Sequence, residues 1–385
     1  MKKVLILQLK GKSYGGVWQV NKLIGEALLD KEYEVSIVSI RNNQNDLIFE
    51  HDKRLNVLTI NETDDWGSYQ GAEIINEIKK IKPLKATKMI ISRIKYELKL
   101  NQDIKKLHKY INNYQPNHIV VSHYQILDML PKEYLNITIN LQHSAFEDAI
   151  KHKATRKTLE KYNGKIKYLW LTKKTMESAI KYGLTNSSYI YNAVRFKSEE
   201  RAKVYEKKKL ITIARLSNDK RIDIMIDIVK EIFKDKKYKD WKLEIYGNGE
   251  LEEDLKKQID NHKQIKLMGR TDDPKKELLN ASINLNTSPY EGFSLSILEA
   301  NECGVPTITF DFGESVNEEI INGKTGIIAD SKEDYINKLK ELMLNEEKLQ
   351  EISENAKNFS KEFHIENIIN KWIELFDENN NNTSN

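Results

Sequence analysis

Two glutamates, Glu291 and Glu299, lie eight residues apart on either side of a turn that leads into a helix. Apolar residues over 282–286 predict a strand, turn-forming residues follow as far as Gly292, and helical spacing of apolar side chains resumes at Leu295. The first backbone N–H groups of such a helix have no intrahelical partner and lie at the positive end of its dipole, so they suit a phosphate. Carboxylates can accept hydrogen bonds from hydroxyl groups. The segment therefore predicts a site for a ligand that carries phosphate and hydroxyl groups, although the spacing alone would favour an ordinary surface helix.

Two cations strengthen the prediction of a ligand site. Arg215 and Lys220 follow an apolar strand predicted over 210–214 and precede an amphipathic helix that starts near Ile222. A diphosphate that departs from a sugar gains negative charge as the bond breaks, so cations aimed at it stabilise the transition state more than the ground state. Arginine can grip with two parallel hydrogen bonds, and lysine acts as a point charge. Singly, each cation would be a solvated surface charge; together with the glutamates they favour a diphosphate site.

The segment that starts at Glu291 reads EGFSLSILEANECGVPTI and resembles the glutamate-x7-glutamate element of retaining GT-B glycosyltransferases of family 4. Ser294 stands where that family has a glycine. The segment around Arg215 resembles the family's G-R-L-x-x-x-K-G element, with Ala214 and Arg221 in place of the two glycines. The resemblance implies an α/β protein with the GT-B fold, in which two Rossmann-like, doubly wound parallel-sheet domains face each other across a cleft.

The resemblance also implies a reaction. A hexose or N-acetylhexosamine would pass, with retention, from a nucleoside-diphosphate sugar, expected to be a UDP-sugar, to a bacterial cell-surface glycan, a teichoic-type polymer or a lipid-linked precursor. The donor is then a co-substrate, and no cofactor is expected. No metal is expected either, because two cations supply positive charge and no convincing D-x-D element is found.

The site residues are carried over from the resemblance. The implied catalytic residues are Arg215, Lys220, Glu291 and His143. The implied donor-binding residues are Gly15, Gly16, Arg215, Lys220, Met268, Gly269, Arg270, Glu291, Gly292, Phe293, Ser294, Leu295 and Glu299. In this scheme the two cations stabilise the departing diphosphate, Glu291 positions the donor sugar and Glu299 holds the ribose. The amides of residues 292–295 complete a phosphate cradle.

Three further segments resemble landmarks of the same family. Residues 268–270 lie where family members contact the nucleobase through main-chain groups, whereas Gly247 and Gly249 are predicted to shape a turn. Asn192 echoes the first residue of the family's N-G-V-D element, but Ala193 and Arg195 depart from that pattern. We interpret it as a turn in the hinge region.

The first half of the chain contains fewer candidate site residues. Gly15 and Gly16 follow the first predicted strand and could contact the donor diphosphate and the acceptor, although a structural tight turn is an equal alternative. His143 ends the strand predicted over 137–141, and ligands of open α/β sheets bind at the carboxyl ends of strands. It could orient the donor sugar or the acceptor; a structural histidine that contacts a backbone carbonyl is the alternative.

Length and composition indicate how the chain is divided into domains. The chain has 385 residues, of which 39% are apolar, enough for two cores. The predicted parts are an acceptor-binding domain (1–195), a linker (196–209), a donor-binding domain (210–362), a terminal helix that crosses back to the first domain (363–378) and a disordered tail (379–385). A single cysteine excludes an internal disulfide. No segment approaches the ~20 apolar residues that span a bilayer, so we expect a cytoplasmic protein, soluble or peripheral on the inner face of the membrane.

Basic residues cluster between Lys79 and Lys109 and alternate with apolar ones, a pattern that can lie on an anionic membrane surface. The alternative is a solvated helix whose apolar stripe packs on its own domain. A second basic run, from Lys151 to Lys174, could attract anionic polymers. Nucleic acid is not expected, because no aromatic and basic recognition module is present.

Two other functions remain open at this point. One is a sugar-nucleotide epimerase on a similar architecture. The other is a non-catalytic, glycan-binding partner subunit of a glycosyltransferase complex, against which the presence of both cations argues.

Overall fold

The computed structural model describes residues 1–11, 16–41, 50–62, 83–313 and 315–382. Of the residues singled out above, Gly15 and the stretch 79–82 lie outside these ranges, as does the end of the predicted tail. The chain divides into two compact units: unit 1 holds residues 1–141, 157–168 and 375–385, and unit 2 holds residues 142–156 and 169–374.

The first sheet has seven strands in the order β3-β2-β1-β4-β5-β6-β7. Its strands are β1 (Lys3–Lys10), β2 (Glu34–Arg41), β3 (Asn56–Asn61), β4 (His118–Val121), β5 (Thr138–Leu141), β6 (Lys167–Trp170) and β7 (Ser187–Tyr189). The associated helices are α1 (Gly16–Leu29), α3 (Pro83–Tyr114), α4 (Phe146–Lys151), α5 (Lys153–Tyr162) and α6 (Lys173–Tyr182), with 3-10 turns at Tyr124–Met129 and Lys132–Ile137. β1 pairs in parallel with β2 and with β4, so the strand order reverses between β1 and β4.

The second sheet has six strands in the order β10-β9-β8-β11-β12-β13. These are β8 (Lys209–Ile213), β9 (Lys242–Tyr246), β10 (Ile265–Gly269), β11 (Ile283–Leu285), β12 (Thr307–Phe310) and β13 (Gly326–Ala329). β8 pairs in parallel with β9 and β11, which makes the β8/β11 junction the point where this strand order reverses. Parallel sheets that reverse in this way are doubly wound, as predicted.

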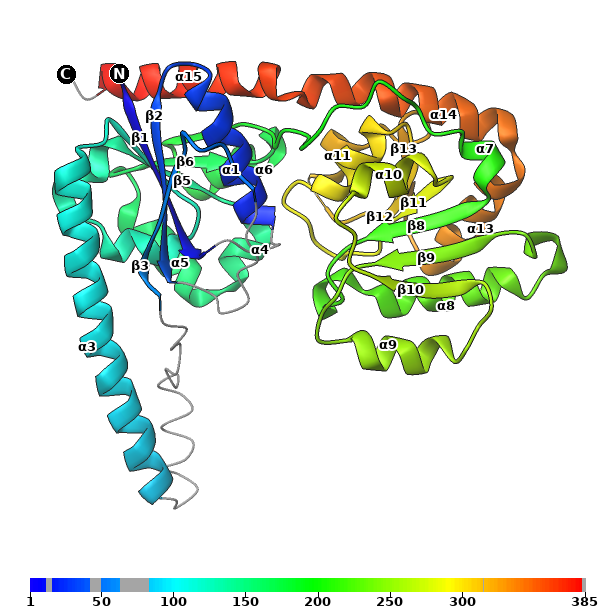
Figure 1. The fold of residues 1–385 in the computed structure, drawn as a ribbon, viewed down its shortest axis with the longest axis horizontal. Coiled ribbons are helices and arrows are strands. Elements are labelled where there is room, and N and C mark those ends of the chain that lie inside the picture. The colour runs from blue at the N-terminus through cyan, green and yellow to red at the C-terminus, as the bar shows by residue number, and fades with distance from the viewer. Residues whose placement is uncertain (12–15, 42–49, 63–82, 314, 383–385) are drawn as a thin grey trace. The chain divides into compact units, whose positions relative to one another are not determined.

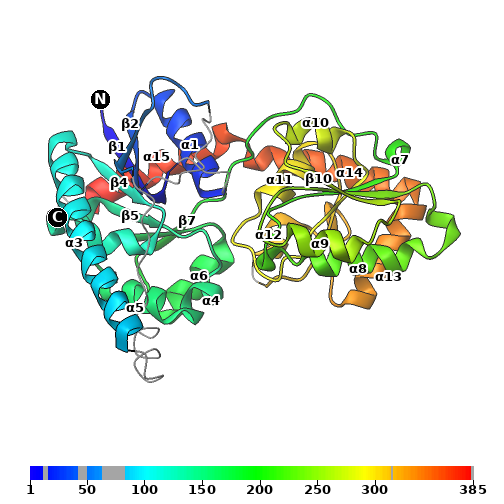
Figure 2. The same ribbon diagram turned by 60° about the horizontal axis from the view of Figure 1, so that its bottom comes forward.

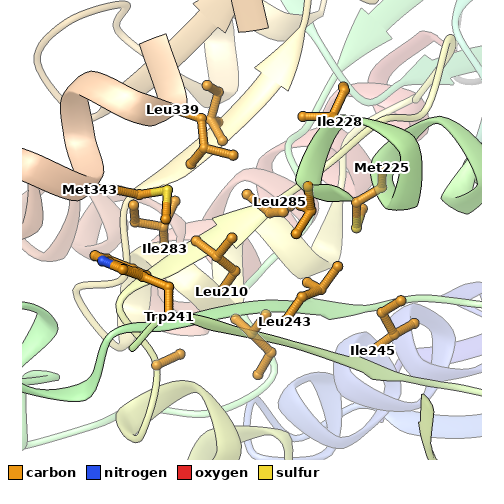
Figure 3. Packing of buried hydrophobic residues seen from close by; sticks show 14 of the residues in the cluster. Leu210, Met225, Ile228, Trp241, Leu243, Ile245, Ile283, Leu285, Leu339 and Met343 are labelled. Atoms are coloured by element: carbon orange, nitrogen blue, oxygen red, sulfur yellow. The ribbon is translucent and has the colours of Figure 1, made fainter. Parts of the chain in front are cut away.

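Helices cover both faces of the second sheet (Figures 1 and 2). The helices of this part of the chain are α7 (Val204–Lys207), α8 (Ile222–Phe233), α9 (Glu252–Ile259), α10 (Pro274–Leu279), α11 (Leu295–Glu302), α12 (Val316–Glu319), α13 (Lys332–Leu344) and α14 (Glu346–Phe359), with 3-10 turns at Asn218–Lys220, Lys236–Tyr238 and Ser360–Phe363; α15 (Ile365–Asn382) follows. Because both faces are covered, nearly every residue of β8, β9, β11, β12 and β13 is buried, whichever face of the sheet its side chain points to. Figure 3 shows the core of this unit, where side chains of α8 and α13 pack over those of the central strands.

α15 is shared between the two units. Residues 365–374 belong to unit 2, and the remainder of the helix belongs to unit 1. In unit 1 the ring of Phe376 stacks on that of His118 with 4.4 Å between centroids, and Lys2 Nζ donates to Asp377 at 2.7 Å. The end of the helix is thus part of the core beside β1 and β4.

No helix of the described part of the chain is long and apolar enough to cross a membrane. The longest, α3, extends well beyond the strands of its own sheet (Figure 1).

Candidate functional site

Several of the predicted donor residues lie on the loops at the carboxyl ends of β8 and β11, the two strands between which the order of the second sheet reverses. This is where ligands bind in open α/β sheets, because the loops diverge there and leave a crevice. The loop after β8 carries Arg215 and Lys220, and the loop after β11 carries Glu291. Thr287 joins the two loops, since its Oγ1 lies 3.0 Å from the carbonyl oxygen of Lys220 and 2.9 Å from that of Arg221.

Lys220 and Glu291 form an ion pair across these loops. The lysine Nζ donates to Glu291 Oε1 at 2.6 Å, and the two side chains are only 23% and 14% exposed. Ser315 Oγ donates to the Glu291 carbonyl oxygen at 3.0 Å and so fixes the loop from a third side. Two residues that lie 71 positions apart in the chain, and that were predicted to serve one ligand, therefore touch.

Arg215 lies on the same loop, and its side chain is exposed. Its charge reaches Asp219, whose carboxylate accepts from Ser217 Oγ at 2.5 Å. Burial alone would raise the pKa of Asp219, but that hydrogen bond and the charges of Lys220 and Arg215 outweigh burial and lower it. The loop is therefore electropositive enough to hold a carboxylate in its ionised form, and it would favour a phosphate in the same way.

The N-terminus of α11 faces a buried acid that the motifs did not reveal. Ser294 N–H donates to Glu319 Oε2 at 2.7 Å, so this amide of the predicted phosphate cradle is already engaged. Glu319 is fully buried, and among the described residues no partner reaches its Oε1. Burial raises the pKa of Glu319 well above its usual value, and the hydrogen bond from Ser294 does not offset this effect. Burial therefore favours the protonated, neutral form of this side chain.

Gly292 is required by close packing of two backbones. A Cβ atom at this position would lie 2.1 Å from the carbonyl oxygen of His143, much closer than atoms can approach. The structure thus brings His143, a predicted cleft residue that follows β5, against the loop that carries Glu291. The half-buried histidine lies beside the site, as its place at the end of a strand suggested.

Glu299 lies inside α11 with only 2% of its side chain exposed, and it is paired with Arg195. Arg195 Nη2 donates to Oε2 at 2.7 Å, and Nε donates to Oε1. In the sequence, Arg195 is notable only because it departs from the family pattern. That departure marks the residue as unusual, but the spacing of residues could not predict that its partner lies 104 positions away.

The predicted base-contacting segment forms the end of β10 and the residues that follow it. Met268 is 43% exposed, and the carbonyl oxygen of Gly269 accepts from Gly247 N–H at 2.8 Å. A Cβ atom on Gly247 would lie 1.8 Å from the carbonyl oxygen of Ala214, and one on Gly249 would lie 2.3 Å from that of Leu216. The prediction that these two glycines shape a turn is confirmed: they let the end of β9 pack directly against the loop that carries Arg215.

Two more predicted residues can be placed. Arg270 forms an ion pair with Asp272. Gly16 is the first residue of α1 in unit 1. No group of three or more histidine, cysteine, aspartate or glutamate side chains suited to a metal ion occurs among the residues that the structure describes.

Comparison with known proteins identifies this arrangement. Residues 194–359, which carry the β8 and β11 loops, match the family Glycosyl transferases group 1. This segment belongs to that family. Over the whole length, an uncharacterized glycosyltransferase from Haemophilus influenzae is 25% identical over 387 residues, which covers 97% of this chain and 99% of that protein.

Other relatives align with less than half of this chain. Poly(glycerol-phosphate) alpha-glucosyltransferase from Bacillus subtilis is 32% identical over 178 residues, which covers 43% of this chain and 25% of that protein. Poly(ribitol-phosphate) alpha-N-acetylglucosaminyltransferase from Staphylococcus aureus is 29% identical over 170 residues, which covers 43% and 34%. The match thus spans a quarter to a third of these two proteins.

Solved structures show the fold over nearly the whole chain. TarM from S. aureus, in a complex that contains UDP, superposes with a TM-score of 0.76 at 16% identity and covers 98% of this chain and 100% of that one. HepE from Anabaena, in complex with UDP-glucose, gives a TM-score of 0.73 at 16% identity with the same coverage. The predicted GT-B fold, with its two doubly wound parallel sheets, is confirmed.

Proposed function

We propose that the chain transfers a hexose or N-acetylhexosamine from a UDP-sugar to a bacterial cell-surface glycan, with retention and without a metal ion. The observation that carries this proposal is the Lys220–Glu291 pair, which lies with Arg215 on the two loops at the β8/β11 switch point. Support for UDP comes from TarM and HepE, whose structures contain UDP or UDP-glucose. Support for a teichoic-type acceptor comes from the names of the two relatives that act on polyol-phosphate polymers.

The ion pair suggests how the donor would be handled. As the bond between the sugar and the diphosphate breaks, negative charge accumulates on the departing phosphate, and Arg215 and Lys220 would stabilise it. A diphosphate competes with Glu291 for the Lys220 ammonium. Binding would therefore release the Glu291 carboxylate to accept hydrogen bonds from the donor sugar. Retention of configuration rests on the family resemblance, and no residue is assigned as a nucleophile.

Calorimetric titration with UDP, GDP and ADP tests the donor site. We expect UDP to bind, and Lys220→Met to weaken binding by about 10- to 100-fold, the value of a hydrogen bond between charged groups. Lys263→Met is the matched control, because this exposed lysine lies before β10, at the opposite end of the sheet. If no nucleotide binds, the donor site is refuted. If UDP binds but no sugar is transferred to any polyol-phosphate or lipid-linked acceptor, the non-catalytic partner subunit becomes the better account.

We further propose that α3 contacts an anionic membrane surface where such acceptors reside. The helix packs inward through Met89, Leu107 and Ile111, which are 3%, 0% and 0% exposed. A second apolar stripe faces outward: Ile90, Ile91, Ile94 and Leu98 are 42%, 48%, 55% and 60% exposed. Packing against the domain therefore explains the buried apolar side chains of α3 but not the four exposed ones.

The charges of α3 complement an anionic surface. Its exposed lysines are Lys88, Lys95, Lys105, Lys106 and Lys109. The two acidic residues of its described part are both paired: Glu97 with Arg93, and buried Asp103 with Arg41 at 3.6 Å. An apolar stripe flanked by unopposed lysines can lie in the interface of a bilayer, where each nearby cation contributes about 1 kcal/mol.

A further inference from the structure

The carboxylate of Glu299 is held by a single counter-charge. It lies in α11 with 2% of its side chain exposed, and Arg195 grips both of its oxygens, one through Nη2 at 2.7 Å and the other through Nε. A carboxylate this deeply buried is costly unless it is paired and hydrogen-bonded. Arg195 supplies both the charge and two parallel hydrogen bonds, the geometry in which arginine binds carboxylates most strongly.

The segment that carries Arg195 is itself fixed to the surroundings of the site. Asn192 Nδ2 donates to the carbonyl oxygen of Phe293, in the loop that leads into α11, at 3.1 Å. Val194 N–H donates to the carbonyl oxygen of Phe363 at 2.9 Å. Two anchors within three residues leave the guanidinium little freedom to move away from Glu299. The orientation of the carboxylate is therefore determined from outside its own helix.

Arg195 does not use the whole hydrogen-bonding capacity of the Glu299 carboxylate. A carboxylate offers about four lone-pair positions, two on each oxygen. Arg195 takes one on each oxygen, so one on each remains without a side-chain or backbone partner among the described residues. Two acceptors at fixed positions on neighbouring oxygens match a vicinal diol, such as the 2′ and 3′ hydroxyls of a ribose.

We infer that Arg195 is a positioning residue that orients the Glu299 carboxylate so that its two remaining lone pairs accept the ribose hydroxyls of the donor nucleotide. This inference rests on the proposed function, transfer from a UDP-sugar, and on the ribose-binding role that the family resemblance implies for Glu299. The role of Arg195 differs from what the family pattern implies, because the N-G-V-D element has an acidic residue in its place.

Comparing UDP with 2′,3′-dideoxy-UDP tests the inference directly, because the two ligands differ only in the hydroxyls concerned. The native chain should bind UDP about 10- to 100-fold more tightly than the dideoxy analogue, as expected for hydrogen bonds to a charged group. Arg195→Met and Glu299→Gln should both lose most of this preference by weakening UDP rather than the analogue. Arg201→Met is the matched control, since its pair with Glu354 joins the same stretch of chain to a different helix and both side chains are exposed.

Two further variants separate positioning from stability. Arg195→Lys keeps the charge but cannot span both oxygens, so the preference should fall at least about threefold. The exchange of Arg195→Glu with Glu299→Arg restores the ion pair, and with it the melting temperature, but a guanidinium cannot accept from hydroxyls. We expect the exchanged protein to fold and to show no preference for ribose.

The outcomes are distinct. A native preference for UDP that survives in Arg195→Met, or in Arg195→Lys if the methionine variant does not fold, overturns the role of Arg195 and leaves the proposed function intact. A native-like preference in the exchanged protein shows that pairing alone matters, and it also overturns the inference. A native chain that binds neither ligand refutes the donor site and this inference together.

Discussion

Glu319 shows how one buried residue can set the pH response of the site. Its carboxyl group accepts from Ser294 N–H at the start of α11 and is fully buried, so its pKa in the folded protein lies well above the usual value of 4.5. Above pH 4.5 the unfolded chain releases this proton, whereas the folded chain keeps it. The contribution of Glu319 to the free energy of unfolding is therefore fully present below pH 4.5, and it declines as the pH rises toward the pKa of Glu319 in the folded state.

Glu319→Gln should remove that decline. The amide oxygen can still accept from Ser294, and no proton remains to be lost. We expect the melting temperature of the variant to exceed that of the native chain by an amount that grows between pH 5 and pH 8, reaching at least about 2 °C. Thermal unfolding followed by circular dichroism measures it. Glu199→Gln, on the exposed surface, should follow the native curve; a constant difference across the range would show that Glu319 is ionised when folded.

Motifs predicted some of these residues and not others, for physical reasons. Lys220 and Glu291 were assigned to one ligand because each lies in a local pattern that resembles a family element, and the structure places them in contact. The segment that begins at Glu319 also resembles a family element, but the burial of this acid depends on how α12 packs and could not be predicted from the motif. Arg195 lies 104 positions from Glu299, and no periodicity relates them. Pairs created by tertiary packing are not visible in local spacing.

At the scale of secondary-structure elements, the loop after β8 is held against the end of β9 by a glycine. Gly247 has a φ of 146°, and a Cβ atom there would lie 1.8 Å from the carbonyl oxygen of Ala214. Gly247→Ala should destabilise unit 2 by on the order of 3 kcal/mol, since strain and collision add. It should also weaken UDP binding, because the loop with Arg215 must move.

A second glycine allows the effect of backbone strain to be measured without the steric collision expected at Gly247. Gly323 has a φ of 77°, also in the left-handed region, but a Cβ atom there meets nothing within 4 Å. Gly323→Ala should cost only about 1 kcal/mol and leave nucleotide affinity unchanged. Chemical denaturation of both variants gives the comparison; equal losses would mean that the close approach to Ala214 is unimportant.

The outward stripe of α3 leads to a prediction about the element as a whole. Ile94→Ser with Leu98→Ser should lower binding to vesicles that contain anionic lipid by at least about tenfold, because two buried apolar groups are lost from the interface. Sedimentation with vesicles measures it. Ile180→Ser with Leu344→Ser removes exposed apolar side chains elsewhere, 39% and 56% exposed, and should bind as the native chain does.

Vesicles of zwitterionic lipid complete that test. Weak binding of every variant to them is expected, since the lysines of α3 then have no anionic partner. Equal binding of all variants to anionic vesicles would refute α3 as the contact. Helical periodicity predicted an apolar stripe here but could not show that the helix carries two stripes and packs only one of them.

On the scale of the whole molecule, the two units depend on one helix, α15, and a histidine lies under its end. His118 stacks on Phe376, and neither of its ring nitrogens has a partner among the described residues. Burial, aided by the charge of Lys2, lowers the pKa of His118 to about 4, and the pKa of half-buried His123, which follows β4, is also lowered to about 4. Both histidines are therefore neutral when folded. Their contribution to stability is present above pH 6.5 and is lost as the pH falls toward 4.

His118→Phe should make unit 1 more resistant to acid. Phenylalanine preserves the stack on Phe376, removes two unsatisfied nitrogens and cannot be protonated. The gain in melting temperature should increase as the pH falls from 6.5 to 4, with the remaining acid sensitivity due to His123. His364→Phe is the contrasting variant, because this partly exposed histidine contacts buried Glu302 at 2.8 Å, and its loss should destabilise the protein instead. A gain in melting temperature that is independent of pH would show that the pKa of His118 is the same in the folded and the unfolded chain.

The division of α15 between the units also has a consequence for biosynthesis. Residues 1–141 belong to unit 1, but Leu375 and Phe376, buried in the same unit at 4% and 0% exposure, leave the ribosome more than two hundred residues later. Strands β1 to β5 therefore have to wait, with part of their apolar surface uncovered, while the intervening residues are translated. Chaperones that bind nascent chains should be occupied by this protein until Phe376 has emerged, and a message cut short before that codon should yield a product that is degraded rather than one that is merely inactive.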